Sequence, residues 1–212
     1  MRHIIICEGE SESAYLQRLQ SFLEEQDSVS GRFEPALNFM VPKRAIAKGG
    51  SFGKLKSSYN SERRTNKNIA IQIWADFDIY HRNYKNCADH YKIKTDGIPD
   101  FQFSFHNFED FYALHFDGPI LQRWLQFGSL ASTRHFTLPL HSVDYQPEFR
   151  QIFPGYVKGV VPVDFVSWQS LKNLKVNLAH QPTSNPHNVK QIGSFAGFLI
   201  GQIDQHYPGK LA

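Results

Sequence analysis

Apolar runs and amphipathic segments alternate along the first half of the chain. Two runs, 3–7 and 69–75, are rich in Ile and short enough to be strands buried on both faces, which is typical of a parallel sheet. Residues 101–105 alternate Phe with polar residues, as a strand with one aromatic face does. The sequence predicts strands at 3–7, within 33–41, at 69–75 and at 101–105, and helices near 12–25 and 54–67.

The second half of the chain is predicted to be helical. A stripe of aromatic residues predicts a helix over 108–116, and Pro119 suits the first turn of a short helix that ends near Gly128. Residues 129–157 show no clear period and are predicted to be loop. Apolar spacing predicts two further helices, one near 164–179 and a last one whose stripe runs from Val189 to Ile203.

Alternating strands and helices indicate an α/β fold, in which helices flank a parallel sheet. We expect residues 1–116 to form this core and residues 117–212 to form a helical C-terminal extension packed on the same domain. No apolar run approaches the ~20 residues needed to cross a bilayer, and the chain begins without a signal-peptide pattern. We therefore expect a cytoplasmic protein without a membrane partner.

Charge is unevenly distributed, although the whole chain carries only +3. Residues 43–67 hold eight basic residues and one acid, a net charge of +7, which leaves −4 for the rest of the chain. Such segregation favours a polyanionic partner such as nucleic acid, but a solvated helix face explains a charge run equally well. The candidates for phosphate contact are Lys43, Arg44, Lys48, Lys54 and Lys56.

Acidic residues follow the two Ile-rich strands directly. Glu8 comes after the first strand, and Asp76 and Asp78 come after the second. Because the carboxyl ends of parallel strands share one edge of a sheet, these carboxylates are predicted to meet there, and they suit a hard cation such as Mg²⁺ or Mn²⁺. Glu12 lies one helical turn after Glu8 and can join the same ion. Alternatively, Glu12 only complements the helix dipole, with Ser11 as the N-cap.

A third acidic segment follows the strand at 101–105. Glu109 is a candidate metal ligand or supporting group, since it opens on the same edge of the sheet. The alternative is purely structural: Asn107 is a good N-cap, and acids are favourable in a first helical turn. Zinc chemistry is not indicated, because the chain has two cysteines and its ten histidines match no zinc-binding spacing.

Several of these motifs together resemble the TOPRIM domain, most closely that of the small RloB-like proteins. Glu8-Gly9 followed by Glu12 and Tyr15 resembles their first motif, with the spacing shifted by one position, and Ala75-Asp76-Phe77-Asp78 resembles their D-x-D strand. A third motif is similar to Ser104–Phe116, although Phe105-His106 stands where the family has Asn-Pro. Their Y-x-K resembles Tyr156-Val157-Lys158.

The resemblance implies a TOPRIM-like fold and a metal-dependent nuclease of bacterial phage defence. Glu8, Glu12, Asp76 and Asp78 would bind Mg²⁺ or Mn²⁺, Glu109 would support the metals, and Lys158 would stabilise the scissile phosphate. A partner protein encoded nearby and a homo-oligomer are both compatible with this class. Two alternatives stay open: the same metal site hydrolysing a small nucleotide or signalling molecule, and a non-catalytic effector that binds nucleic acid or a protein.

Overall fold

A parallel sheet lies between two layers of helices in the computed structural model of this chain, which describes all residues except 43–51, 77–100, 105–106, 134–141 and 179–192. The strands run in the order β2-β1-β3-β4-β5, and every neighbouring pair is parallel. The strands are β1 (Arg2–Cys7), β2 (Asn38–Met40), β3 (Ala70–Asp76), β4 (Phe101–Ser104) and β5 (Gly193–Ser194). The predicted α/β fold with a parallel sheet is therefore confirmed.

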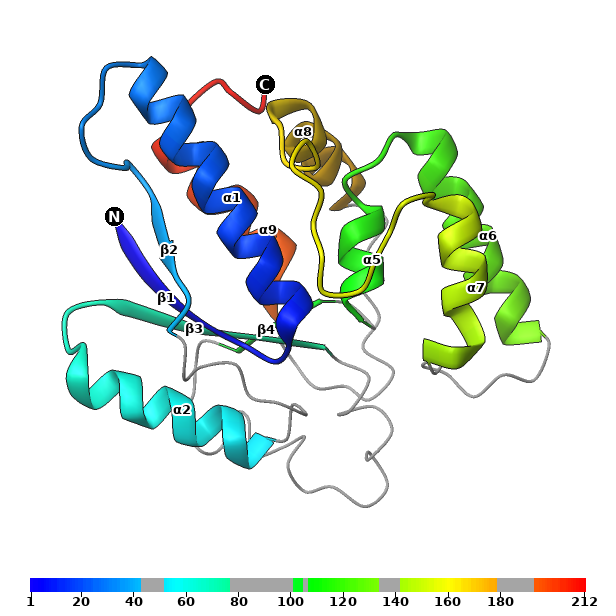
Figure 1. Cartoon of the computed structure of the whole chain (residues 1–212), viewed down its shortest axis with the longest axis horizontal. Coiled ribbons are helices and arrows are strands. Elements are labelled where there is room, and N and C mark those ends of the chain that lie inside the picture. The colour runs from blue at the N-terminus through cyan, green and yellow to red at the C-terminus, as the bar shows by residue number, and fades with distance from the viewer. Residues whose placement is uncertain (43–51, 77–100, 105–106, 134–141, 179–192) are drawn as a thin grey trace.

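Helices cover both faces of the sheet. In Figure 1, α1 and α9 lie over one face, α2 lies under the other, and α6 and α7 form a pair to one side. The described helices are α1 (Glu10–Val29), α2 (Phe52–Thr65), α5 (Phe108–Ala113), α6 (Gly118–Thr133), α7 (Ser142–Ile152), α8 (Trp168–Asn177) and α9 (Phe195–His206). Because β5 and α9 come from the C-terminal half, this half also contributes to the sheet layer. The division at residue 116 stays a prediction.

Alternate residues of the central strands pack into two separate apolar cores. Successive side chains of a strand point to opposite faces, so an unbroken apolar run serves both faces at once. The core under α1, α5 and α9 contains Ile5, Cys7 and Trp74 from the sheet. The core over α2 contains Ile4, Ile6, Ile71, Ile73, Ala75, Leu55 and Tyr59.

Trp74 is the centre of the larger core. Its ring stacks on Phe195 of α9 with centroids 3.7 Å apart, and Tyr15 of α1 and Phe111 of α5 meet it edge-on. Its indole N–H donates to the Ser104 hydroxyl at 2.7 Å, so the buried polar atom is satisfied. One aromatic side chain thus fixes α1, α5 and α9 relative to β3 and β4.

One helix contradicts the predicted loop at 129–157. Residues 142–152 form α7, whose Tyr145, Phe149 and Ile152 are buried at helical spacing. Pro147 lies inside this helix, where it removes a backbone hydrogen bond and obscures the helical signal. Packing of this buried face outweighs the cost of the proline.

The other helix predictions differ from the structure at their ends. Helix α6 continues to Thr133, past the predicted end near Gly128. Helix α8 begins only at Trp168, because the Ser167 hydroxyl accepts from the Ser170 N–H and caps it there. Residues 189–192 of the last predicted stripe lie outside the described residues. Within the described part of the chain, no helix is both long and apolar enough to cross a membrane.

A buried hydrogen-bonded pair joins α1 to the end of α5. His115 Nδ1 lies 3.1 Å from the Phe111 carbonyl oxygen, and Nε2 lies 2.8 Å from the Tyr15 hydroxyl. A carbonyl only accepts, so Nδ1 carries the proton and Nε2 accepts from Tyr15. Burial lowers the pKa of His115 to about 4. The ring is therefore neutral in the folded protein at neutral pH.

This histidine predicts a loss of stability on acidification. Its unfolded pKa is near 6.5 and its folded pKa is about 4, so the unfolded chain binds the proton first as the pH falls. Between pH 7 and pH 5, the free energy of unfolding should fall by about 2 kcal/mol more in the wild type than in His115→Gln, which keeps an acceptor for Tyr15. Urea unfolding of both proteins at the two pH values measures this, and equal pH dependence contradicts it.

Candidate active site

The crevice between β1 and β3 is the topological switch point of the sheet. From β1 the chain passes through α1 to β2 on one side, whereas β4 pairs with β3 on the other side. Neighbouring strands whose continuations diverge leave an open crevice at their carboxyl ends, which is where open α/β sheets bind ligands. Glu8 follows β1 directly and Asp76 is the last residue of β3. The sheet therefore delivers both predicted acids to this crevice.

Glu8 and Asp76 are joined across the crevice. The Glu8 N–H donates to the Trp74 carbonyl at 3.0 Å, which extends the pairing of β1 and β3 by one residue. The Glu8 carboxylate then accepts the Asp76 N–H on Oε2 at 2.7 Å. Among the described atoms, the Asp76 Oδ1 is buried and has no hydrogen-bond partner. A buried acceptor without a donor is costly, and a bound cation would satisfy it.

Glu12 lies in the first turn of α1, and its side chain contacts the residue that precedes the helix. The helix begins at Glu10 with Gly9 as N-cap, so the alternative that placed the cap at Ser11 is wrong. Instead, Glu12 Oε2 accepts the Gly9 N–H at 3.1 Å. A Cβ at position 9 would lie 3.0 Å from that oxygen, which explains why glycine suits the position. Glu12 thus takes part in a capping box at the start of the helix, and its carboxylate also lies at the crevice.

Glu109 enters from α5, beside the other acids. Asn107 caps this helix by accepting the Asp110 N–H at 3.1 Å, which confirms it as the N-cap. Glu109 itself is only 2% exposed, and its two oxygens accept the hydroxyls of Tyr145 and Tyr156 at 3.0 and 2.9 Å. Burial and the Glu109 charge raise the pKa of both tyrosines, so both hydroxyls stay protonated as donors.

Lys158 approaches the acids from a tight turn. Val157 and Val160 pair as an antiparallel bridge, and Gly159 takes a positive φ of 79° within the turn. The Gly159 N–H donates to the Ser11 hydroxyl at 3.2 Å, so the turn is attached to the first turn of α1. This contact holds the Lys158 backbone at the crevice, while its side chain is exposed.

These elements enclose a cleft of about 360 Å³. Five acids and one lysine are among its lining residues. The full lining is Glu8, Gly9, Glu10, Ser11, Glu12, Asp76, Phe108, Glu109, Lys158 and Gly159. Five of the six predicted catalytic residues therefore meet in one cleft. Asp78, the sixth, lies outside the described residues.

The charge balance of the cleft is unfavourable for its acids. Burial raises the pKa of Glu12 to about 7, the Glu109 charge adds to this, and Lys158 opposes it. Burial and the charges of Glu12, Glu8 and Glu109 also raise the pKa of Asp76 well above its ordinary value. Crowded carboxylates of this kind release their protons readily only when positive charge is supplied.

The donors have the right chemistry for Mg²⁺ or Mn²⁺, which prefer carboxylate oxygens. The buried Asp76 Oδ1 provides a ligand atom that no described group uses. However, in the described parts of the chain no three His, Cys, Asp or Glu side chains converge closely enough to hold a metal ion. Glu8 and Glu12 each accept a backbone N–H. Metal binding would require these two carboxylates to turn.

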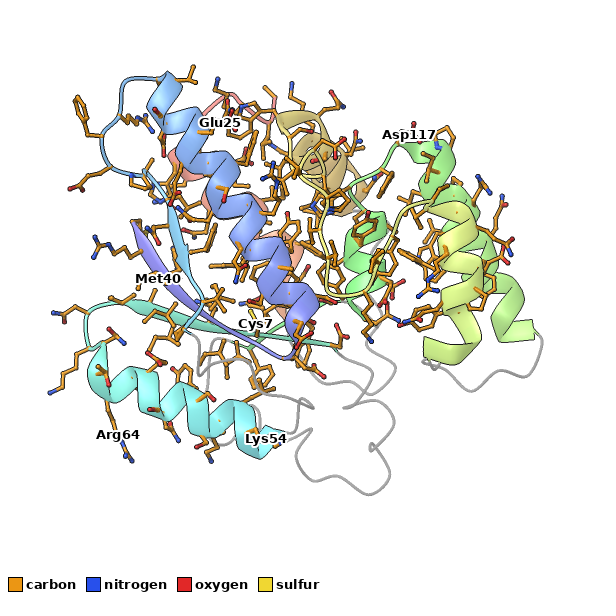
Figure 2. The ribbon with its side chains drawn as sticks, viewed as in Figure 1. Cys7, Glu25, Met40, Lys54, Arg64 and Asp117 are labelled. Carbon is orange, nitrogen blue, oxygen red and sulfur yellow. The ribbon has the colours of Figure 1, made fainter. Side chains whose placement is uncertain are left out.

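The predicted phosphate contacts are only partly described. Lys43, Arg44 and Lys48 lie outside the described residues, and Lys54 and Lys56 lie on α2. Neither lines the cleft. Figure 2 shows Lys54 at the end of α2 that points toward the carboxyl ends of the strands, with Arg64 at the opposite end. Of the two ends of this basic helix, the Lys54 end is therefore the one that points toward the edge with the acids.

The sequence analysis missed Tyr145 as a site residue. It falls in the segment predicted to be loop, where the helical spacing of Tyr145, Phe149 and Ile152 is obscured by Pro147.

Searches against protein-family models, curated proteins and solved structures found no match for this chain.

The crowded acids predict that removing one charge stabilises the metal-free fold. Folding raises the pKa of the Glu12 carboxyl from 4.5 to about 7, so this group lowers the free energy of unfolding as the pH rises through that range. At pH 8 in EDTA, Glu12→Gln should therefore raise the free energy of unfolding by about 1–3 kcal/mol. Glu25→Gln, at an exposed position of the same helix, should change it little. If Glu12→Gln instead destabilises the protein, Glu12 is a structural cap.

Proposed function

We propose that this protein is a Mg²⁺- or Mn²⁺-dependent nuclease that hydrolyses phosphodiester bonds. The observation that carries the proposal is the meeting of Glu8, Glu12, Asp76, Glu109 and Lys158 in one cleft at the switch point of the sheet. Buried acids that repel one another are expensive to keep unless they bind a cation. The TOPRIM resemblance described above supports the same chemistry.

Each predicted catalytic residue has a role in this proposal. Glu8, Glu12, Asp76 and Asp78 would hold the ions, and Glu109 would support them. Two bound ions supply an activated water and neutralise the leaving oxygen. Lys158 would place its charge against the phosphate, because its turn is held at the cleft by the Gly159–Ser11 hydrogen bond.

The proposed substrate is a nucleic acid polymer. The basic residues of segment 43–67 would contact its backbone phosphates, which positions a strand without reading its sequence. Helix α2 supports this, because its Lys54 end lies toward the edge of the sheet that bears the acids (Figure 2). Phage defence in the cytoplasm, with a partner protein encoded nearby, is the biological setting we propose for this activity.

A small nucleotide is the second candidate substrate. The described cleft measures about 360 Å³, at the lower end of the ~300–1,000 Å³ of ordinary small-molecule pockets. The same metal chemistry would then act on a substrate that fits within the cleft. Contact with α2 separates the two candidates, because only a polymer extends beyond the cleft to reach that helix.

Asp76→Asn tests the proposed catalytic site. This variant keeps the size of the side chain but removes its charge, so we expect Mn²⁺-dependent cleavage of nucleic acid to fall by at least about 100-fold while the circular dichroism spectrum is unchanged. Asp117→Asn, at an acid preceding α6 away from the cleft, is the control and should retain activity. Equal cleavage by Asp76→Asn and the wild type would refute the two-metal site. Absence of both Mn²⁺ binding and cleavage in the wild type would leave only a non-catalytic role.

Lys54→Gln tests whether the substrate is a polymer. Polymer binding should weaken steeply with salt, because neutralised phosphates release counterions. Lys54→Gln should weaken it more than Arg64→Gln, since Lys54 lies toward the acidic edge and Arg64 at the far end of the same helix. Fluorescence anisotropy with labelled single- and double-stranded oligonucleotides measures both effects. Hydrolysis of a dinucleotide that neither variant affects, without salt-dependent polymer binding, would favour the small substrate.

A further inference from the structure

Glu109 differs from the other cleft acids in the kind of donor it accepts. Glu8 and Glu12 accept backbone N–H groups, Glu8 from Asp76 across the crevice and Glu12 from Gly9 at the start of its own helix. Glu109 accepts two phenolic O–H groups, from Tyr145 on Oε2 at 3.0 Å and from Tyr156 on Oε1 at 2.9 Å. A carboxylate that accepts one donor on each oxygen has its plane and its position fixed.

The two tyrosines come from α7 and from the segment that follows it. Tyr145 belongs to α7, which packs beside α6 at one side of the molecule (Figure 1). Tyr156 lies just after α7 and two residues before Lys158, in the segment that forms the cleft wall. Both side chains are buried, and neither lines the cleft. Their hydroxyls contact the cleft residue Glu109 directly.

We infer that Tyr145 and Tyr156 are positioning residues that fix the Glu109 carboxylate for cation binding in the cleft. This inference rests on the proposed function. The hydroxyls hold Glu109 where its charge acts on both Glu12 and Asp76. Partners that orient a metal-supporting carboxylate commonly change metal affinity by about 10–100-fold when they are removed.

The rings of these tyrosines pack against other aromatic rings, whereas their hydroxyls donate to Glu109. The Tyr156 ring packs against Tyr112 and Phe149 with centroids 5.0 and 4.7 Å away, and the Tyr145 ring meets Trp124 at 6.0 Å. Phe keeps these ring contacts and removes only the O–H donor. Tyr145→Phe and Tyr156→Phe are therefore clean probes of the two hydrogen bonds.

Tyr207 offers a matched control at a remote place. Its hydroxyl donates to the buried carboxylate of Asp27 at 2.7 Å, so Tyr207→Phe also removes an O–H from a buried acid. Asp27 lies near the end of α1 opposite to Glu12 and does not line the cleft. Loss of stability without loss of metal binding is the expected result for this variant.

The experiment is a calorimetric Mn²⁺ titration of the full chain. We expect the Kd for Mn²⁺ to rise about 10-fold in Tyr145→Phe and in Tyr156→Phe, and to stay unchanged in Tyr207→Phe. The double variants with Glu109→Gln then ask whether the tyrosines act through Glu109. Once Glu109→Gln is present, removing either hydroxyl should change the Kd by less than about 2-fold.

The outcomes distinguish failure of the proposed role of the tyrosines from failure of the proposed function. Unchanged Mn²⁺ affinity in both tyrosine variants, with affinity lost in Asp76→Asn, overturns the inference and keeps the metal site. Additive effects in the Glu109→Gln background also overturn it, because the tyrosines would then act independently of Glu109. A wild-type protein that binds no Mn²⁺ overturns the proposed function and the inference together.

Discussion

The hydrogen bond from the Asp76 N–H to the Glu8 carboxylate is the contact around which the site is built. It replaces the next step of the β1–β3 ladder with a side chain, so the two strands separate there while their ends stay joined. The parallel register places Cys7 opposite Trp74, and this makes Glu8 and Asp76 neighbours beyond the ladder. Helix α1 begins immediately after Glu8 and delivers Glu12 to the same crevice. A shift of one residue in this register would separate the two acids and exchange the side chains that β1 gives to the two cores.

Protein donors compensate part of the negative charge of the acids in the cleft. Backbone N–H groups serve Glu8 and Glu12, and two tyrosine hydroxyls serve Glu109. These dipoles compensate each carboxylate locally, but they do not remove the mutual repulsion that raises the pKa of Glu12 and Asp76. The crowded acids therefore lower the stability of the folded protein. Such a loss of stability is typical of functional sites, where residues are selected for chemistry and not for stability.

The sequence predicted the parallel sheet and the meeting of its acids, because both follow from local patterns. Ile-rich runs define buried strands, and strand ends share an edge, so Glu8 and Asp76 were predictable without knowing any contact. The hydrogen bonds from Tyr145 and Tyr156 to Glu109 were not predictable in this way. Tyr145 reaches Glu109 across 36 positions of sequence, through a helix whose pattern Pro147 interrupts. The N-cap at Gly9 was also missed, because glycine has no side-chain oxygen to accept from the first helical N–H groups, whereas Ser11 has one.

The proposed function makes the order of binding a consequence of charge. A cleft lined by five acids and one lysine repels a phosphate as long as no cation is present. The basic helix α2 covers the opposite face of the sheet from α1, and its Lys54 end points to the same edge. A polymer can therefore be held at a distance by α2 before its backbone enters the cleft. In this proposal Glu8, Glu12 and Asp76 would hold the cation, whose charge would offset the acids and join that of Lys158 when the scissile phosphate enters. In this view the basic segment binds the substrate, and the acidic cleft with its cation controls whether the phosphate enters.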